Sequence, residues 1–371
     1  PECPNGTVIR FDLSLTADNN LTFEIPAYIT VSDAYMNFVA YQISDTNNQA
    51  LDPGESAEFN ITLKNNGTIT ANDLYGLLIT QNDLVQVQDN IAYFGNILPG
   101  AQMSSVIDTF RLAGRPQLLP GMVIPMRLKL YNTAGFVQWI DFSLTAGVVT
   151  STNPLGPDAH GYVIYDMTDT SYEDCPTYQW VGIAPAEGGQ GTALALTDTG
   201  STSDEGDAVG AASLVTIPLP FPFTFYGISY EQITVCSNGF IAMGVTENAN
   251  YRNFRLPGTA TGGGGAPSPL IAPFWDDLIT TGGGVFQWHD ATNHRFIIEW
   301  YNCKNGYVQT AVETFQIILY DPVYYPTSLG DGPIKIQYHT FNNVDTGGSS
   351  NEYSGNYCTV GIQNQEQNIG L

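Results

Sequence analysis

Two adjacent carboxylates, Asp276 and Asp277, end an apolar run that begins at Leu270. A pair of carboxylates is what a glycoside hydrolase needs, with one acting as the acid and the other as the base or nucleophile. In an extended strand, however, neighbouring side chains point to opposite faces, so these two residues do not form an acid/base pair by themselves. The pattern favours a structural role, with one carboxylate holding the following loop or binding Ca²⁺.

Nucleophilic catalysis would need a Cys–His or similar pair from the few suitable side chains. The histidines are His160, His289, His294 and His339, and the cysteines are Cys3, Cys175, Cys236, Cys303 and Cys358. No α/β pattern that would position such a pair is visible in the sequence. His289 and His294 flank a turn with Asp290 and would suit a transition metal, but exposed turn histidines are the simpler interpretation. We therefore expect a non-enzymatic chain with no catalytic residue and no organic cofactor.

Calcium is the ligand that the sequence supports best, because Ca²⁺ takes six to eight oxygens, commonly from Asp, Asn and carbonyl groups of loops. Three acidic stretches offer such oxygens: Asp45, Asn47, Asp52 and Glu55; Asp198, Asp204 and Asp207; and Asp276 with Asp277. None has the spacing of an EF-hand loop. A solvated acidic turn is the alternative for each stretch, and Ca²⁺ is the one cofactor that the sequence suggests.

The five cysteines are too few for a disulfide scaffold and lack the Cys-x-x-Cys spacing of a zinc site. Cys303 and Cys358 each border an expected strand and are the candidate disulfide, although four cysteines in one domain allow three connectivities. Cys236 lies within an apolar strand, where a small buried thiol is expected. The odd total leaves one thiol free or linked to another chain.

Two features of the sequence suggest glycans, one as a covalent modification and the other as a bound ligand. Four Asn-x-Ser/Thr sequons predict glycosylation acceptors at Asn5, Asn20, Asn60 and Asn66, although several sequons arise by chance in a chain rich in Asn and Thr. Exposed aromatics such as Tyr251, Tyr324 and Tyr325 would also suit stacking on a surface glycan. Filling of a large β-sandwich is the default role of such rings.

The charge balance excludes one class of partner. With 36 acidic and 11 basic residues the formal net charge is −25, and phosphate binding needs Lys and Arg, so we expect no nucleic-acid partner. An acidic surface suits solubility outside the cell. No apolar run approaches the length of about 18 residues that spans a bilayer, and no signal peptide stands at the start. We therefore expect an extracellular or cell-surface protein with a processed N-terminus and no membrane span.

The composition indicates an all-β protein. Charged residues make up only 13% of the chain and aromatics 12%, whereas exposed helix faces are rich in Lys, Glu and Arg. The clearest element is Glu231–Gly244, in which two β-rich runs flank Asn238 and Gly239. This dipeptide predicts a type I′ hairpin turn with positive φ at both central residues. Another buried strand is expected within Leu270–Leu278.

Residues 1–33 predict a single hairpin and no domain of their own. Its first strand recurs, because Gly6–Leu15 aligns with Gly121–Leu130 at a constant offset (121 − 6 = 115), with Gly, Val, Ile, Leu and Leu identical. We interpret the hairpin as the closing hairpin of an Ig-like module whose body lies elsewhere. An isolated hairpin is marginal in water. It must therefore pack on a preceding domain, on the following module or on a neighbouring subunit by strand addition.

The rest of the chain predicts two β-sandwiches. Residues 34–148 carry about seven or eight short strand signals and predict an Ig-like sandwich. One half-buried strand is marked by alternating apolar positions, Ala57, Phe59, Ile61 and Leu63. Residues 149–159 have the composition of a linker. Residues 160–371 carry about twelve strand signals and predict one large β-sandwich or jelly-roll-like domain.

Two sets of motifs resemble known modules. Asp45–Glu55 followed by Leu63–Gly67 resembles the Ig-like modules of large secreted bacterial proteins. In the second domain the motifs are Leu219–Gly227, Cys236–Ile241, Ala272–Leu278, Phe296–Trp300, Thr314–Tyr320 and Thr359–Asn364. This series resembles a β module of surface-attached bacterial proteins, including gingipain-type peptidases and adhesin-like proteins, and more distantly the nidogen-type extracellular module. The resemblance implies an accessory module without catalytic residues.

These observations predict a non-enzymatic extracellular structural protein. It would be a subunit of a surface filament, sheath or adhesive layer, assembled by β-strand complementation as residues 1–33 complete the fold of a neighbour. Two alternatives stay open. One is a non-catalytic accessory region of a larger secreted peptidase or hydrolase, to whose upstream domain the hairpin belongs. The other is a carbohydrate-binding module.

Overall fold

The computed structural model describes residues 7–18, 22–200, 212–253, 255–258, 267–344 and 358–371. The protein is all-β, as predicted: no α-helix occurs in these ranges, and the 3₁₀ turn η1 (Pro185–Glu187) is the one helical element among them. All paired strands that the structure describes are antiparallel.

The chain divides into two compact units. One comprises Pro1–Asn153 with Thr168–Cys175, and the other Pro154–Met167 with Pro176–Leu371. The expected linker, residues 149–159, is therefore divided between them. Its later part belongs to the second unit, where Leu155 and Ile164 form an isolated β-bridge.

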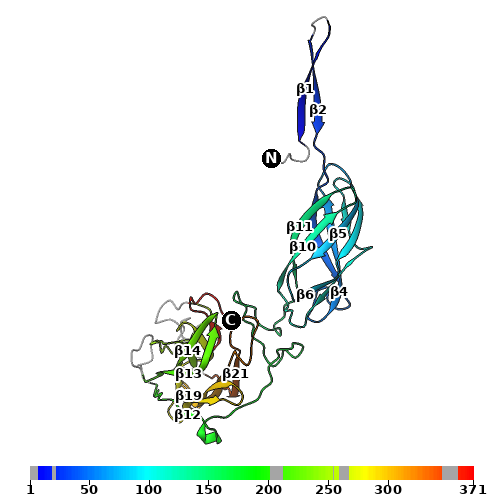
Figure 1. The fold of residues 1–371 in the computed structure, drawn as a ribbon. Helices are drawn as coiled ribbons and strands as arrows, with labels where there is room; N and C mark the ends of the chain where they lie inside the picture. Colours follow the sequence, from blue (N-terminus) through cyan, green and yellow to red (C-terminus); the bar gives the residue numbers. More distant parts are fainter. Residues whose placement is uncertain (1–6, 19–21, 201–211, 254, 259–266, 345–357) are drawn as a thin grey trace. The chain divides into compact units, whose positions relative to one another are not determined.

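The first unit begins with a separate two-stranded sheet (Figure 1). It consists of β1 (Val8–Thr16) and β2 (Thr22–Thr30), which pair along their whole length. Within the described part of the chain, neither strand joins another sheet. Alternation of large apolar with polar residues favours this extended form, since successive side chains of a strand point to opposite faces.

A β-sandwich makes up the rest of the first unit. Its strands are β3 (Met36–Ser44), β4 (Ser56–Asn65), β5 (Ala71–Ile79), β6 (Val85–Asp89), β7 (Ile91–Ile97), β8 (Gln102–Ser104), β9 (Phe110–Gly114), β10 (Val123–Tyr131) and β11 (Val137–Thr145). One sheet has the order β11-β10-β5-β7, and the other has β3-β4-β9-β6 with β8 paired to β4. This pattern of two packed antiparallel sheets is that of an Ig-like sandwich.

The core of this sandwich lies between its two sheets. Phe59 of β4 and Leu128 of β10 come from opposite sheets and are both fully buried in it. The predicted alternation in β4 is confirmed, because its four apolar positions, Ala57, Phe59, Ile61 and Leu63, are all buried. Burial of such apolar surface stabilises the fold by roughly 25 cal/mol per Å².

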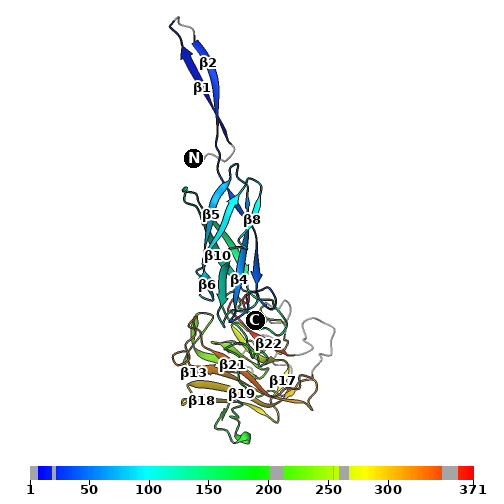
Figure 2. The ribbon, with the colours of Figure 1, turned by 90° about the vertical axis from the view of Figure 1, so that its right-hand side faces the viewer.

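The second unit is a larger β-sandwich (Figure 2). One set of strands is β12 (Thr192–Ala193), β17 (Leu278–Ile279), β18 (Gly284–Asp290), β19 (Arg295–Asn305), β20 (Val312–Tyr320) and β21 (Ile334–Thr340). They form a sheet of order β12-β18-β19-β20-β21, with β17 paired to β19. The other set is β13 (Leu214–Phe225), β14 (Ile228–Cys236), β15 (Phe240–Met243), β16 (Leu270–Trp275) and β22 (Thr359–Gln363), in the order β13-β14-β15-β16-β22.

Aromatic rings fill the space between these two sheets. Phe315 of β20 stacks on Trp300 of β19, with ring centroids 5.0 Å apart, and on Phe274 of the opposite sheet, 5.3 Å away. All three side chains are fully buried. The predicted large sandwich therefore has one continuous apolar core.

The hairpin expected within Glu231–Gly244 forms, but its turn differs from the prediction. Cys236 of β14 pairs with Phe240 of β15, so the loop has one residue more than a type I′ turn allows. Of the loop residues, all of which are described, only Gly239 has positive φ, at 76°. The predicted type I′ turn is therefore wrong. The loop is instead of the three-residue type that ends in a left-handed residue, and a Cβ at Gly239 would lie 1.8 Å from the Phe274 carbonyl oxygen.

Candidate functional site

The hairpin β1–β2 carries large apolar side chains that its own two strands do not bury. Every residue of β1 is exposed, and so is every residue of β2 except the half-buried Ala27. Leu13 is 50% exposed and Phe23 is 55% exposed. Soluble proteins rarely expose contiguous apolar patches of more than a few hundred Å², so such a patch marks an interaction surface.

The same hairpin architecture occurs inside the first sandwich as β10–β11. There the pairing runs from Val123 opposite Thr145, whereas in β1–β2 it runs from Val8 opposite Thr30. Both strands are shifted by the same offset (123 − 8 = 115 and 145 − 30 = 115), and strand lengths, register and connection length agree. The repeat predicted from the first strand therefore extends to the whole hairpin.

The counterpart shows which face of the hairpin has the composition of a core. In β10–β11 the core-facing side chains are Ile124, Met126, Leu128, Leu130, Gln138, Ile140, Phe142 and Leu144. The corresponding residues of β1–β2 are Ile9, Phe11, Leu13, Leu15, Phe23, Ile25, Ala27 and Ile29. We call this second set the apolar face. Every member is apolar, so the hairpin resembles a closing hairpin whose inner face is uncovered in the described part of the chain.

The hairpin also presents a free strand edge. Its counterpart β10 pairs with β5, from Arg127 opposite Ile79 to Tyr131 opposite Tyr75. At the same offset, the backbone from Asp12 onward in β1 occupies the position that would pair with a β5-like strand. Among the described strands β1 pairs with β2 alone, and an unpaired edge is a template for another strand.

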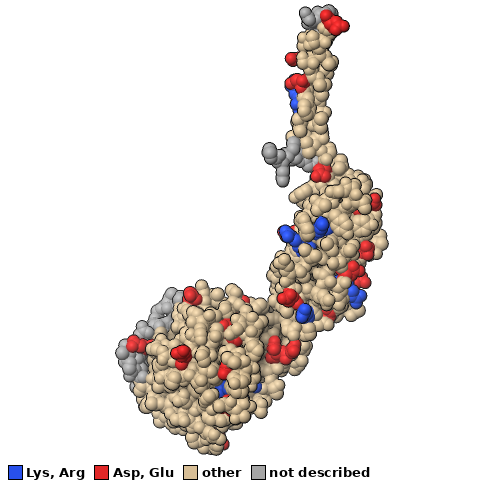
Figure 3. All heavy atoms as spheres, in the orientation of Figure 1, with Lys and Arg blue, Asp and Glu red and all other residues tan. Residues whose placement is uncertain are grey.

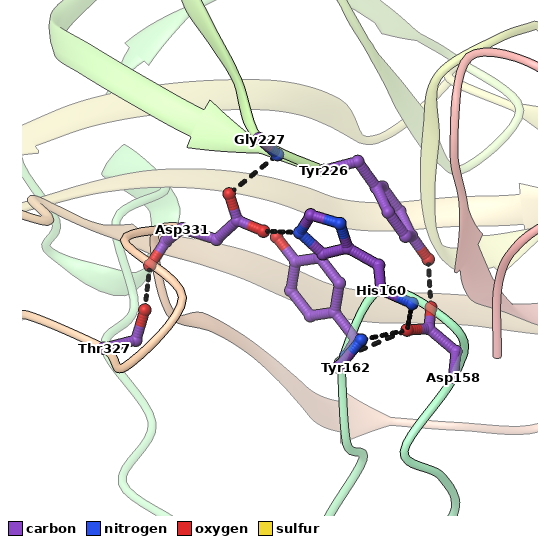
Figure 4. A network of polar contacts seen from close by, with 8 residues as sticks. Asp158, His160, Tyr162, Tyr226, Gly227, Thr327 and Asp331 are labelled. Atoms are coloured by element: carbon purple, nitrogen blue, oxygen red, sulfur yellow. Dashed lines mark hydrogen bonds and ion pairs between the residues drawn. The ribbon is translucent and has the colours of Figure 1, made fainter.

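In the second unit, Asp158 organises a partly buried polar network (Figure 4). Its Oδ1 accepts backbone N–H bonds from His160, Gly161 and Tyr162 at 2.8–3.0 Å, and its Oδ2 accepts the hydroxyl of Tyr226 at 2.8 Å. Burial, together with the nearby carboxylates, raises the pKa of Tyr162 and Tyr226 well above the usual value. Both phenols are therefore neutral at physiological pH.

The network continues from His160 to a distant loop. His160 Nε2 lies 2.6 Å from Asp331 Oδ2, while Asp331 Oδ1 accepts the N–H of Gly227 at 2.9 Å. A histidine beside a buried carboxylate belongs to a catalytic triad when a Ser or Cys nucleophile lies on its other side. The ring contacts that the structure describes for His160 are to Asp331, Tyr162 and Tyr226. This arrangement fastens three chain segments together and has no nucleophile within the described contacts.

Besides this network, a row of polar side chains crosses the neighbouring strands β19, β20 and β21. Glu299, Gln316 and Gln337 stand opposite one another on the face turned away from the main core. The segment before η1 lies over them: the Ile183 N–H donates to Glu299 Oε2 at 2.7 Å, and Gln337 exchanges two hydrogen bonds with the Gln179 backbone at 2.7 and 2.8 Å. Hydrogen bonds from side chains of the sheet, rather than backbone pairing between strands, thus hold this segment on the sheet.

Glu299 is a buried carboxyl group that interacts with a second one, that of Glu187. It is fully buried, and its Oε1 has no hydrogen-bond partner among the described residues. Burial raises the pKa of Glu299 to about 8, because an ionised carboxylate loses its hydration there. The row is therefore a pH-sensitive structural feature.

The first predicted calcium stretch is a loop closed by its own hydrogen bonds. The Asp45 carboxylate accepts three backbone N–H groups at 2.9–3.1 Å, and Asn47 Nδ2 donates to Asp52 and Glu55 at 3.3 and 3.4 Å. Burial acts to raise the pKa of Asp45, but these backbone bonds outweigh it and lower the pKa. The four predicted residues thus lie together, and calcium binding by them stays a prediction.

The other two acidic stretches are placed differently. Asp198 is buried and accepts the Ser237 hydroxyl at 2.6 Å, whereas Asp204 and Asp207 lie outside the described residues. Asp276 is buried and Asp277 is half-buried. No group of three His, Cys, Asp or Glu side chains within the described ranges is arranged to hold a metal ion. A calcium site here stays a prediction from the sequence pattern.

The predicted disulfide between Cys303 and Cys358 is wrong, because both are free thiols. Cys303 points into the core from β19, with its sulfur 3.8 Å from the Gly284 carbonyl oxygen, whereas Cys358 precedes β22 in the other sheet. Burial raises the pKa of each thiol to about 12. Cys236 is fully buried, as predicted, and Cys3 lies outside the described residues.

The glycosylation sequons fall into three groups. Asn60 is only 7% exposed within β4, so it is wrong as an acceptor in the folded protein, since an attached glycan needs an exposed side chain. Asn66 is exposed in the following turn, and its glycosylation stays a prediction. Asn5 and Asn20 lie outside the described residues.

The predicted sugar-stacking tyrosines also differ in exposure. Tyr324 and Tyr325 are exposed, whereas Tyr251 is half-buried. Tyr324 stacks on His294, one of the two predicted turn histidines, with 3.4 Å between ring centroids. His289 packs near Phe221 instead, so each histidine ring has its own aromatic neighbour.

The sequence interpretation missed the two polar networks of the second unit. Glu299 had a visible signal, because it is the one charged residue in the apolar run Phe296–Trp300. His160 and Asp331 are 171 positions apart. No local pattern connects residues at that separation, so their pairing could only be seen in the folded chain.

Comparison with known proteins identifies the second domain. A family model described as NIDO related matches residues 163–371, which supports the predicted nidogen-like module. A comparison with curated proteins gives no match. No helix among the described residues is both long and apolar enough to cross a membrane.

Proposed function

The chain belongs to the NIDO-related family through residues 163–371, and from this premise we propose that it is a non-enzymatic structural protein of the cell exterior. In this proposal it is a subunit of a surface filament, sheath or adhesive layer, and it associates with neighbours through residues 1–33. The nidogen-like character of the second domain supports the extracellular location. The acidic composition, with a net charge of −25, is in keeping with a soluble surface outside the cell.

The observation that carries the proposal is the uncovered apolar face. Eight positions that fill a core in β10–β11 are apolar in β1–β2, and none of them is buried. Covering such a face stabilises it by on the order of 1 kcal/mol for each large side chain that leaves water. A hairpin of this kind is only marginally stable by itself, and a partner that covers its apolar face would stabilise it.

The pairing of β10–β11 within this chain favours a mode of association other than strand complementation. The prediction was that the hairpin completes the Ig-like module of a neighbour, but in this chain β10–β11 already fills that position and pairs with β5. A neighbour could accept the hairpin there only by releasing its own. We therefore propose that two copies pack apolar face on apolar face, an isologous contact that closes as a dimer. This dimer would be the building unit of the surface layer, and growth of the layer would use a second, separate contact.

The test compares two substitutions on one strand. Leu13 and Ser14 are adjacent in β1, both are exposed, and they lie on opposite faces. Leu13→Asp puts a charge into the proposed contact, and Ser14→Asp puts the same charge on the other side. Mass photometry across a concentration series and negative-stain electron microscopy follow association. We expect Leu13→Asp to weaken association at least about tenfold, as deletion of residues 1–33 should, and Ser14→Asp to leave it unchanged.

Two results would contradict the proposal. One is a wild-type chain that stays monomeric at every concentration. The other is a Leu13→Asp variant that associates like wild type. Circular dichroism and thermal unfolding of both variants show that any change in association is not a loss of the fold.

The first sandwich, which β10–β11 already closes, also supports a second candidate function. Since β10–β11 already closes the sandwich of this chain, the identical register of β1–β2 also fits a separate Ig-like body on a longer polypeptide. The chain would then be a non-catalytic accessory region of a larger secreted peptidase or hydrolase. In that case an Ig-like body joined upstream should cover the apolar face, and the joined protein should be monomeric.

A further inference from the structure

The sheet β11-β10-β5-β7 carries a strip of aromatic rings on the face that points away from the sandwich core. Tyr131 of β10, Tyr75 of β5 and Tyr93 of β7 stand opposite one another on neighbouring strands. The Tyr75 ring centroid lies 5.8 Å from that of Tyr131 and 4.8 Å from that of Tyr93. Trp139 of β11 adds a ring that is 46% exposed. We call these four residues the aromatic strip.

Two basic side chains lie against the strip. Lys129 is opposite Trp139, and its Nζ is 5.7 Å from the Trp139 ring centroid and 6.0 Å from that of Tyr131. The Arg127 guanidinium carbon is 5.1 Å from the Trp139 centroid, and its Nε donates to Asp141 at 2.6 Å. Figure 3 shows Lys and Arg atoms gathered over the part of the surface where β10 and β11 lie. In a chain with 11 basic residues, this pair is a local departure from the acidic average.

The same sheet face leads into an open hollow of about 470 Å³. Arg127 and Asp141 belong to its lining, together with the hydroxyl and amide groups of Thr80, Gln81 and Ser143. Apolar side chains complete the lining. A ligand that lies along this face therefore meets aromatic rings, apolar surface and hydrogen-bonding groups.

The repeat provides an internal comparison for the strip. At the constant offset, the hairpin positions that correspond to Tyr131, Trp139 and Lys129 are Thr16, Glu24 and Ser14. The hairpin adopts the same strands and register with polar residues at these positions. The strand architecture therefore does not require aromatic rings on this face, and their presence in β10–β11 calls for another explanation.

We propose that this sheet face binds a neutral polysaccharide, with sugar rings packed on the aromatic strip and hydroxyl groups bonded by Lys129, Arg127 and the polar groups among those that line the hollow. The C–H face of a pyranose ring carries partial positive charge, and the face of an aromatic ring carries partial negative charge, so the two attract. The strip crosses four neighbouring strands, a width of roughly 14 Å at the usual strand spacing. That width suits an extended oligosaccharide better than a single sugar.

The negative net charge of the chain favours a neutral ligand over an anionic one. A polyanionic glycan would approach a molecule of net charge −25 against its overall field. The local positive charge of Arg127 is offset by Asp141 in a direct ion pair. A neutral polysaccharide meets no such repulsion, and guanidinium, ammonium and carboxylate groups all form hydrogen bonds with hydroxyls.

The experiment is affinity electrophoresis of the full chain in native gels that contain hydroxyethylcellulose, xylan or glucomannan. A gel without polysaccharide and one with polygalacturonate are run alongside. At least one neutral polysaccharide should retard the wild type. Trp139→Ala should raise the dissociation constant about tenfold, whereas Trp139→Phe should keep most of the binding. Tyr35→Ala is the matched control, because Tyr35 is an exposed aromatic of the same unit outside the strip.

Several outcomes would overturn this proposal. They are no retardation by any neutral polysaccharide, retardation by polygalacturonate alone, and retardation that Trp139→Ala leaves unchanged. Loss of oligomers in Trp139→Ala without any polysaccharide effect would identify the face as a protein interface instead. The Leu13→Asp variant should bind polysaccharide like wild type, so this test succeeds or fails independently of the hairpin contact.

Discussion

The hairpins β1–β2 and β10–β11 have the same strand lengths and the same register, yet their environments are opposite. Leu128 in β10 is fully buried, whereas Leu13, its counterpart in β1, is 50% exposed. β10 has a second strand neighbour, β5, and β1 has none among the described strands. Local pairing is thus encoded within each hairpin. Burial depends on a sandwich body, which in the described part of the chain only β10–β11 has.

This difference separates two contributions to a strand's stability. The alternating pattern and the turn suffice to define the hairpin itself. Cross-strand pairs within one hairpin contribute only a few tenths of a kcal/mol to about 1 kcal/mol each. Removal of the inner face from water contributes more, and for β1–β2 that contribution has to come from a partner.

The largest expected effect comes from the same truncation at the two corresponding positions. Leu128→Ala should lower the free energy of unfolding of the first sandwich by about 3 kcal/mol, because it leaves a cavity in a closed core. Leu13→Ala should change the unfolding free energy of the monomeric chain by less than about 0.5 kcal/mol, since the side chain is already in water. Urea denaturation at a concentration where the chain is monomeric measures both.

Equal costs for the two truncations would break the comparison. A large effect of Leu13→Ala would mean that the hairpin is already covered in the monomer. A negligible effect of Leu128→Ala would mean that β10 is not part of a tight core.

A pH-dependent effect of similar size is expected in the second unit. This unit is not part of the hairpin comparison, and the effect there shows which unfolding transition belongs to which unit. Glu299 is buried, and its folded-state pKa of about 8 is above its ordinary value of 4.5. Wild type should therefore lose stability relative to Glu299→Gln as pH rises between these values, because ionisation is favoured in the unfolded chain only. We expect a difference on the order of 2–4 kcal/mol by pH 8, with little further change above it.

Urea denaturation at pH 5, 6.5 and 8 measures this difference. Glu58→Gln replaces an exposed carboxylate in β4 of the first sandwich and is the matched control. The transition that Glu299→Gln shifts belongs to the second unit, and the one that Leu128→Ala shifts belongs to the first. A Glu299→Gln effect that is constant across the pH range would contradict the assigned pKa.

Much of the fold was predictable from the sequence because it rests on local patterns. The period-two alternation in β4 lies within one short segment. The recurrence of Gly6–Leu15 at Gly121–Leu130 is visible because each copy is a continuous segment. The turn at Asn238–Gly239 was placed correctly but assigned the wrong type. Its loop length is set by the register of β14 and β15 and by the close approach of Phe274 to Gly239, which the dipeptide alone does not reveal.

The candidate sites were less predictable because they join distant strands. The aromatic strip exists only because β10 pairs with β5 and β5 with β7, and neither pair is consecutive in the chain. The predicted disulfide was wrong because both thiols are free, with Cys303 within β19 and Cys358 just before β22. Residue type and border position do not determine which sheet a strand joins.

The central claim, that the hairpin is an association element covered by a partner, is tested most directly by amide hydrogen exchange. Peptides covering Val8–Thr16 and Val123–Tyr131 are followed by mass spectrometry at low and high protein concentration, with β10 as the internal reference. We predict that β1 exchanges much faster than β10 in the monomer and slows by about two orders of magnitude or more on association. Exchange of β1 that is as slow as that of β10 in the monomer, or that stays fast in the associated protein, would contradict the account.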